Sequence, residues 1–327
     1  MSASKHRHPV LAALWGCAPL LLAAAMLFWA GNSIMGKAMV GVVPPVALAF
    51  WRWTIALVLI TPLAWPHLRR EWRTLAAGWP VVAALSATGV ATFGALTYVG
   101  VQSTSALNSL LLQAAIPPLI LLFAWIGLRE RASRVQLVGV ALSLAGVVEV
   151  ITRGHPGSIL QLKLNHGDVL ILVGVVLYSI YSLVLRLRPA VHPLSLLWGT
   201  FLGAMVILAP FLAAEAHAGQ VFRPSLAGLG GVAYVAVLPS FLSYLFFNRG
   251  VELIGSGRAG QFMHLIPVFG SVLAVVLLGE AFHPFHAIGV VLIAAGILVA
   301  SRKPRTGGVS AAAAAAAARA PGSAGTP

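Results

Sequence analysis

The chain has 327 residues, of which 59% are hydrophobic and only 9% are charged, and its formal net charge is +14. Soluble domains carry about a quarter of their residues as charged side chains, so this composition excludes a soluble globular protein and indicates an integral membrane protein. The basic residues stand in short segments between apolar ones, a pattern that signals membrane topology and argues against a nucleic-acid partner. The single cysteine, Cys17, excludes an intrachain disulfide and a multi-cysteine metal site.

Ten apolar segments follow a short basic tail at residues 1–16. Each is close to the roughly 20 residues that a bilayer requires, and helices are expected because backbone in lipid must satisfy its own hydrogen bonds. The segments are predicted at 17–37, 45–65, 77–99, 105–127, 135–152, 167–187, 193–213, 226–248, 257–279 and 284–301. The last part of the chain, 302–327, is basic and then alanine-rich, a low-complexity composition that predicts a disordered tail. The fold class is therefore all-α integral membrane, with ten transmembrane helices.

Residues at matching positions recur 150 residues apart along the chain. The pairs are Pro117 with Pro267, Glu130 with Glu280, Gly100 with Gly250, Gly139 with Gly289, and Gly146 with Gly296. This recurrence predicts a duplication, with one five-helix repeat at 17–152 and a second at 167–301. Because five is an odd number, the second repeat must cross the membrane in the opposite sense, which is the inverted arrangement of many secondary transporters.

The orientation follows from the distribution of lysine and arginine. With the N-terminus inside, sixteen of these residues fall on the cytoplasmic side and four on the other. This asymmetry predicts that both termini lie in the cytoplasm. The alanine-rich composition suggests a bacterial source, so a multi-pass protein of a bacterial inner membrane is expected. Glu130 and Glu280 would then lie on opposite faces of the membrane, which argues against a paired catalytic role for them.

The order of several motifs resembles a known family. The first half reads Trp29-Ala-Gly-Asn32, Lys37, Pro45, Arg52, Pro62 and Pro117 to Glu130, and the second half reads Pro193, Pro210 and Pro267 to Glu280. Over roughly residues 17 to 301, this resembles the EamA-like branch of the drug/metabolite transporter superfamily. The resemblance implies two inverted five-helix repeats around a central cavity and transport of small metabolites such as amino acids. The first span has no acidic residue, unlike the short multidrug relatives, which weakens a drug antiport interpretation.

Polar side chains within the spans are candidates for lining that cavity, because they are costly in lipid and usually face water, a cavity or a neighbour. The candidate substrate-binding residues are Trp29, Asn32, Arg52, Asn108, Gln113, Tyr178, Tyr181, Ser243, Tyr244, Gln261 and His264. Helix–helix packing is the alternative role for each of them. Arg52 is suited to attract a substrate carboxylate, and equally to be a structural arginine that binds helix-end carbonyls.

Four prolines within predicted spans mark candidate helix breaks, namely Pro117, Pro118, Pro239 and Pro267. Each removes a backbone donor and frees a carbonyl, and such breaks commonly line cavities in transporters. A packing kink without ligand contact is the alternative. Gly89 stands 150 residues before Pro239, so both helices are expected to be loosened at equivalent points.

The motifs of known catalytic sites are missing from the sequence. There is no Gly-x-Ser-x-Gly elbow, no His-Glu-x-x-His and no Walker loop, so no catalytic residue, metal or cofactor is expected. The predicted function is secondary transport of a small molecule, as an exporter working by alternating access. An intramembrane enzyme or a non-transporting receptor or scaffold are the alternatives. If protons drive transport, His264 is the best candidate proton carrier. Facilitated diffusion without a proton is the alternative. The sequence does not predict the oligomeric state.

Overall fold

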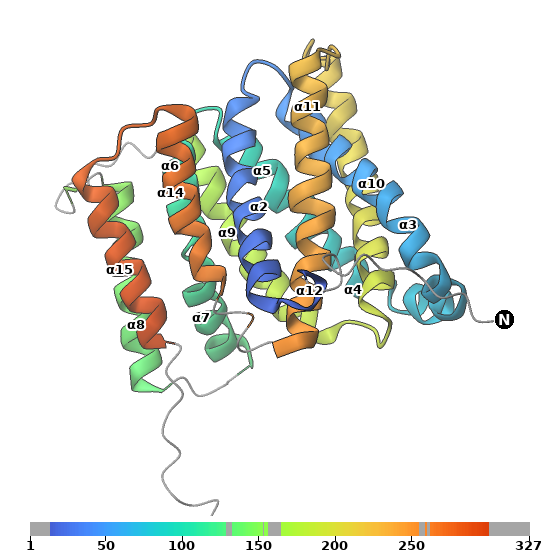
Figure 1. Cartoon of the computed structure of the whole chain (residues 1–327), viewed down its shortest axis with the longest axis horizontal. Helices are drawn as coiled ribbons and strands as arrows, with labels where there is room; N and C mark the ends of the chain where they lie inside the picture. Colours follow the sequence, from blue (N-terminus) through green and yellow to red (C-terminus); the bar gives the residue numbers. More distant parts are fainter. Residues whose placement is uncertain are drawn as a thin grey trace, which may run out of the picture.

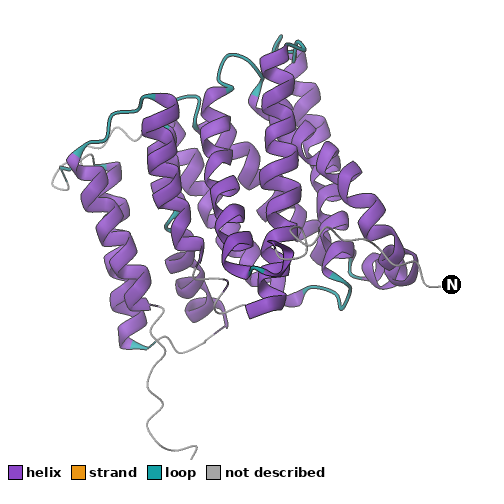
Figure 2. Cartoon of the chain, in the orientation of Figure 1, coloured by secondary structure: helices purple, strands orange, loops and turns teal. Residues whose placement is uncertain are grey.

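The computed structural model describes residues 14–128, 133–152, 154–155, 165–254, 259 and 262–300. Every regular element in these ranges is a helix, and the helices run alongside one another in a single bundle (Figures 1 and 2). The predicted C-terminal tail at 302–327, most of the N-terminal tail, Glu130 and Gln261 lie outside the described residues.

The elements follow one another with short connections. In the first half of the chain they are α2 (Ala18–Ala38), α3 (Pro45–Ala77), α4 (Trp79–Leu85), the π-helix η1 (Ser86–Ala91), α5 (Thr92–Gly100), α6 (Ala106–Gln113), α7 (Ile116–Leu128) and α8 (Arg134–Ile151). In the second half they are α9 (His166–Val184), the 3₁₀ turn η3 (Leu185–Leu187), α10 (Pro193–His217), α11 (Leu226–Val235), the π-helix η4 (Ala236–Leu242), α12 (Ser243–Ile254), the 3₁₀ turn η5 (Phe262–His264), α14 (Leu265–Leu278) and α15 (Pro284–Ala300).

Several of these helices are long and apolar enough to cross a bilayer. Seven such stretches occur among the described residues: Ala18–Ala38, Pro45–Ala77, Trp79–Gly100, Ala106–Gly127, His166–Leu187, Pro193–His217 and Leu226–Ile254. Shorter apolar helices span Leu265–Leu278 and Pro284–Gly296. The chain is thus a multi-pass membrane protein, and ten spans remain a prediction.

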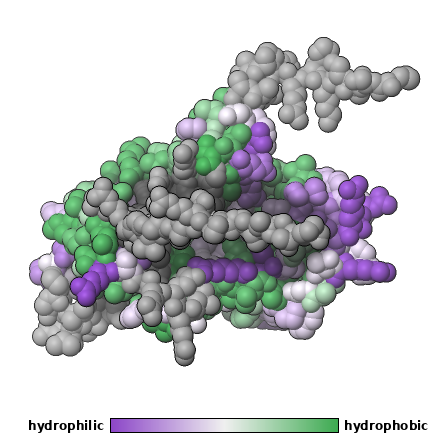
Figure 3. Space-filling model, turned by 90° about the horizontal axis from the view of Figure 1, so that it is seen from below, coloured by the Kyte–Doolittle hydropathy of each residue, from purple (hydrophilic) through white to green (hydrophobic). Residues whose placement is uncertain are grey.

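Helix α3 is longer than the predicted segment 45–65, because it continues to Ala77. Its additional turns carry the exposed residues Arg69, Arg70, Trp72 and Arg73. Tryptophan and arginine are typical of the membrane–water interface, so the helix extends out of the apolar layer instead of ending within it. Viewed from this end, hydrophilic side chains gather at the margin of the bundle where α3 and α10 lie (Figure 3).

Among the described residues, glutamates from other parts of the chain cap three helix N-termini. The N–H groups of Val46 and Ala47, at the start of α3, donate to Glu215 of α10 at 2.9 and 2.8 Å. At the start of α10, the N–H of His192 donates to Glu71 of α3 at 2.9 Å. Helices α3 and α10 have no acidic residue in their own first turns, so each supplies the anion that the other's N-terminal dipole favours. The two helices therefore run antiparallel and are joined at both ends.

A third cap of this kind joins α14 to α6. Glu280 lies just after the C-terminus of α14, and its carboxylate accepts the N–H groups of Ala106 and Leu107 at 2.7 and 2.9 Å. Lys37 at the end of α2 donates to the nearby carbonyl oxygens of Val101 and Thr104 at 2.9 and 2.7 Å. We call this end of the bundle, at the top of Figure 1, the Lys37 end.

Glycines allow α8 and α15 to pack closely at one side of the bundle (Figure 1). A Cβ added to Gly146 would lie 2.8 Å from the carbonyl oxygen of Gly289, and one added to Gly296 would lie 2.5 Å from that of Gly139. Both distances are shorter than real Cβ contacts, so the two backbones approach each other only because these four residues lack side chains. The pairs cross over, since the first glycine of α8 meets the second of α15.

Candidate functional site

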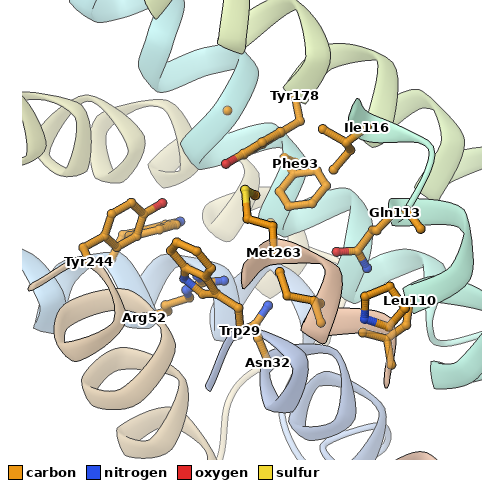
Figure 4. A pocket seen from close by; sticks show the side chains of 16 residues that line it. Trp29, Asn32, Arg52, Phe93, Leu110, Gln113, Ile116, Tyr178, Tyr244 and Met263 are labelled. Carbon is orange, nitrogen blue, oxygen red and sulfur yellow. The ribbon is translucent and has the colours of Figure 1, made fainter. Parts of the chain in front are cut away.

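A cavity of about 140 Å³ lies at the centre of the bundle (Figure 4). Its walls come from both halves of the chain, with contributions from α2, α3, η1, α5, α6, α7, α9, α12 and α14. The described lining residues are Trp29, Asn32, Arg52, Trp53, Gly89, Phe93, Gly94, Leu110, Gln113, Ala114, Ile116, Tyr178, Tyr244, Met263, Ile266 and Pro267. The lining is mostly apolar and aromatic with a few polar groups, which is typical of a site for a small molecule.

Interrupted helices surround the cavity. Helix α6 ends at Gln113 and α7 begins at Ile116, because Pro117 and Pro118 cannot donate to the carbonyls one turn earlier. In the second half, η5 gives way to α14 between His264 and Leu265, just before Pro267. The two interruptions stand 150 residues apart (114–115 and 264–265). Non-helical backbone at membrane depth is found where it is buried in protein or lines a cavity.

Two π-helices form a second matched pair, since η1 begins at Ser86 and η4 begins at Ala236, 150 residues later. Gly89 of η1 lines the cavity, and Pro239 of η4 accepts a hydrogen bond from the lining residue Trp29 through its carbonyl oxygen. Pro239 cannot donate to the carbonyl of Val235, and the hydroxyl of Ser240 donates to that oxygen instead at 2.6 Å. Single-turn π-helices within α-helices are frequent at functional sites.

A buried hydrogen-bond network joins four helices beside the cavity. Arg52 of α3 donates through Nε to the hydroxyl oxygen of Ser240 and through Nη1 to that of Tyr98 at 3.1 Å. Tyr98 of α5 donates in turn to Oδ1 of Asn32 in α2 at 2.6 Å. Only 6% of Arg52 is exposed. The guanidinium is therefore held at a fixed position at the edge of the cavity by neutral oxygen atoms.

Aromatic rings form much of the remaining wall. The Trp29 ring lies 5.7 Å from that of Tyr244 in an edge-to-face arrangement, and the Phe93 ring lies 4.7 Å from that of Tyr178. Trp29 is fixed further because its Nε1 donates to the carbonyl oxygen of Pro239 at 3.0 Å. Figure 4 shows the side chain of Met263 drawn between the rings of Phe93 and Trp29. These rings offer an apolar, polarisable surface to a ligand.

The model of the EamA-like transporter family matches the chain twice, over residues 16–152 and 165–302. The chain belongs to the EamA-like transporter family. This confirms the resemblance drawn from the sequence and the presence of two repeats.

Curated relatives of this EamA-like chain cover most of its length. The uncharacterized transporter YyaM of Bacillus subtilis is 28% identical, over 86% of this chain and 92% of that protein. A probable terminal-alkyne amino-acid exporter of Streptantibioticus cattleyicolor is 26% identical, over 78% of this chain and 84% of its own length. A solved crystal structure with 22% identity superposes with a TM-score of 0.57, over 86% of this chain and 96% of the other, and shows a shared fold.

Six of the eleven predicted cavity residues of the EamA-like chain line the cavity: Trp29, Asn32, Arg52, Gln113, Tyr178 and Tyr244. Gln113 is oriented by its own helix and by α2, because its Nε2 lies 3.0 Å from Ser109 Oγ and 3.1 Å from Ser33 Oγ. Of the predicted helix breaks, Pro267 also lines the cavity, and Pro117 and Pro118 lie in the first turn of α7.

Three predicted residues have other surroundings. Asn108 faces a separate pocket of about 460 Å³ at the Lys37 end, where its Oδ1 lies 3.2 Å from Nε2 of His286. The hydroxyl of Ser243 donates to the carbonyl of Ala25 at 3.3 Å, so it joins α12 to α2. Tyr181 packs against Gly89, which has no side chain to prevent that contact. Asn108 and Gln113 are five residues apart on one helix, and this spacing lets them point into different pockets.

The remaining two predicted residues are in the second repeat. Gln261 lies outside the described residues, and His264 has its backbone in η5 while its side chain lies outside the described part of the chain.

Sequence reasoning missed the apolar part of the lining and two aromatic residues with polar groups. Trp53 lines the cavity, and Tyr98 links Arg52 to Asn32. Both are adjacent to predicted features, since Trp53 follows Arg52 and Tyr98 precedes Gly100. In an apolar chain, however, a tryptophan or tyrosine gives no signal that separates a cavity wall from ordinary packing.

Proposed function

We propose that this EamA-like protein is a secondary transporter that exports small metabolites, amino acids or related compounds, by alternating access. The observation that carries the proposal is the central cavity bordered by matched helix interruptions from both halves of the chain. Transporters of this kind bind cargo near the middle of the membrane, at discontinuous helices along the interface of two repeats.

We infer further that the two repeats are inverted and that ten helices cross the membrane. Two reciprocal sets of contacts and one matched spacing support the inversion. Glu71 and Glu215 cap each other's helices at opposite ends, and the glycines of α8 and α15 meet in crossed pairs. The two π-helices also begin 150 residues apart. A two-fold axis in the membrane plane produces such exchanges, because it turns one repeat upside down relative to the other.

The structure is closest to a state that is closed toward the Lys37 end. A buried apolar layer lies between the cavity and that end, formed around Ile34, Leu107, Leu110, Leu111 and Ala274. Leu110 belongs to this layer and also lines the cavity, and Glu280 joins α6 to α14 beyond it. Alternating access requires this layer to separate in part of the cycle, and the interruptions at 114–115 and 264–265 are suitable hinges.

The substrate class rests on the cavity and on one relative. The cavity has a volume of about 140 Å³, and an enclosed, mostly apolar site of this kind is suited to a small molecule. The exporter of Streptantibioticus cattleyicolor is named for an amino acid, which supports amino acids or related compounds as cargo and export as the direction.

Transport by the purified full-length protein in sealed liposomes tests the proposal. Vesicles loaded with radiolabelled amino acids and without ATP should release them faster than protein-free vesicles, and the released compounds should be chemically unchanged. Strict dependence on added ATP, or release of a modified product, would refute a secondary carrier, and the second result would favour an intramembrane enzyme. A receptor or scaffold would give no release for any compound in the screen.

The location in a bacterial inner membrane with both termini cytoplasmic is tested by labelling. Single cysteines at Ser133 and Ser158 are introduced in a Cys17→Ser background and treated with a membrane-impermeant thiol reagent on intact cells. The sixteen-to-four asymmetry of basic residues predicts labelling at position 158 and protection at position 133. The opposite pattern would overturn this topology.

A further inference from the structure

The buried charge of Arg52 has no carboxylate opposite it among the described residues that line the cavity. Its two hydrogen-bond partners, Ser240 and Tyr98, are neutral hydroxyls. A guanidinium removed from water without an anion is unfavourable, and its remaining N–H groups can bind a carboxylate or similar anion. The cavity therefore has an uncompensated positive charge at one edge.

A donor next to Arg52 lacks a hydrogen-bond partner among the described residues. The indole Nε1–H of Trp53 is buried and makes no hydrogen bond to any described residue, and only 2% of Trp53 is exposed. The guanidinium carbon of Arg52 lies 4.3 Å from the centre of the Trp53 ring, so the two side chains are stacked. Native proteins rarely leave a buried donor unpaired, and an unpaired one calls for an explanation such as a ligand.

Gly94 provides the space in front of both donors. A Cβ added to this residue would lie 3.8 Å from Arg52 Nη1 and also 3.8 Å from Trp53 Nε1. The two nitrogens are thus separated by at most twice that distance, with a gap between them that any other residue would fill. All three residues line the same cavity.

We propose that Arg52, Trp53 and Gly94 form the subsite for a carboxylate group of the transported molecule. This rests on the proposed transport function and narrows it to small monocarboxylates with an apolar body. Arg52 supplies a charge-assisted contact, and Trp53 supplies a neutral N–H to an oxygen of the same group. The rings of Trp29, Phe93, Tyr178 and Tyr244 line the part of the cavity available to the apolar body (Figure 4). No described lining residue is acidic, so the described lining offers no negative charge to an amino group.

The test uses two probes of the same shape, phenylacetate and its neutral amide phenylacetamide. Their binding to the purified full-length protein in detergent is measured by titration calorimetry. Wild type should bind the acid about tenfold or more tightly than the amide, since one charge-assisted hydrogen bond corresponds to at least that ratio.

Two variants report on the subsite without removing Arg52, which also holds Ser240 and Tyr98. Gly94→Ala places a methyl group at an ordinary contact distance from both donors, so it should fold and lose the preference for the acid. Trp53→Phe removes an N–H that has no partner among the described residues and should lower the preference severalfold. Gly230→Ala is the matched control, because a Cβ there meets nothing within 4 Å, and it should keep the wild-type ratio.

Equal affinity of wild type for acid and amide, or an unchanged ratio in Gly94→Ala, would overturn the subsite. Binding of neither probe at millimolar concentration would also count against it. These outcomes are separate from the transport assay. If the protein releases amino acids from vesicles but binds acid and amide equally, only the subsite is refuted. If it binds the acid selectively but transports nothing, the subsite stands and the transport function is refuted.

Discussion

The contact between Glu280 and the start of α6 predicts how the Lys37 end opens. One carboxylate accepts two backbone N–H groups, from Ala106 at 2.7 Å and from Leu107 at 2.9 Å. In Glu280→Gln the side chain keeps a single acceptor, and its amide nitrogen cannot accept the second N–H. The closed state should lose about 1.5 kcal/mol, the low end of the range for a hydrogen bond to a charged group, because Glu280 is only partly buried.

A loss of that size should raise the population of the state open at the Lys37 end by about tenfold, since every 1.4 kcal/mol or so corresponds to a factor of ten. The assay measures the labelling rate of a single cysteine at Ala114, a small residue that lines the cavity beyond the apolar layer. A membrane-impermeant thiol reagent is applied to intact cells that express the variant in a Cys17→Ser background. The rate should rise about tenfold with Glu280→Gln.

Glu252→Gln is the control, because Glu252 is an exposed partner of Arg249 at the surface and caps no helix of the other repeat. Its labelling rate should equal that of the parent. A rate that stays the same in Glu280→Gln would refute the role of this cap in closing the Lys37 end. An equal increase in both variants would show that loss of negative charge, and not loss of the cap, controls access.

Three further variants test other parts of the structure. Gly296→Ala puts a Cβ at 2.5 Å from the Gly139 carbonyl oxygen, so α8 and α15 must separate. The midpoint of thermal unfolding in detergent should fall by several degrees, whereas the control Gly230→Ala should leave it unchanged. His264→Gln should abolish accumulation driven by a pH gradient and spare downhill exchange if His264 carries the proton; unchanged accumulation removes it from the mechanism. Burial, with the neighbouring His67, holds the pKa of His192 below its ordinary value. The unfolded chain therefore binds a proton at higher pH than the folded protein, and stability should decline as the pH falls below about 6.5. This decline should be weaker in His192→Asn. A flat profile in the parent protein would contradict this assignment.

Much of the scaffold could be predicted from the sequence because lipid permits few backbone structures. Long apolar segments must be helices, and proline at a fixed place in a span must free a carbonyl, so the regions around Pro117, Pro239 and Pro267 could be identified as irregular. The end of α3 could not be predicted, because a helix continues beyond its apolar segment where interfacial residues still favour it. The ten spans and their inversion stay predictions that the reciprocal contacts support.

The cavity was harder to predict because helical spacing alone does not tell which face of a helix meets a cavity. Asn108 and Gln113 have the same chemistry and the same helix, yet the first lies against His286 and the second lines the cavity. Ser243 was predicted to line the cavity, but its hydroxyl joins α12 to α2, because a polar group in a span can also serve helix packing. Trp53 became a candidate only when its N–H was found buried and unpaired.

The helix interruptions recur after 150 residues in the second repeat, but the residues that line the cavity do not. Arg52 corresponds to Thr200 in the second repeat, and Thr200 is buried with its hydroxyl donating to Leu197 O, outside the cavity lining. Gln113 corresponds to Met263, and in this pair both residues line the cavity but only the first is polar. The side-chain amides and the guanidinium of the described lining therefore come from the first repeat, while the second contributes tyrosine, methionine, isoleucine and proline. Interruptions that recur in both repeats suit a carrier that opens to either side, whereas a lining that differs between the repeats orients the cargo. A molecule with one charged end should bind with that end toward α3 in both states, so the substitutions that change selectivity should cluster in the first repeat.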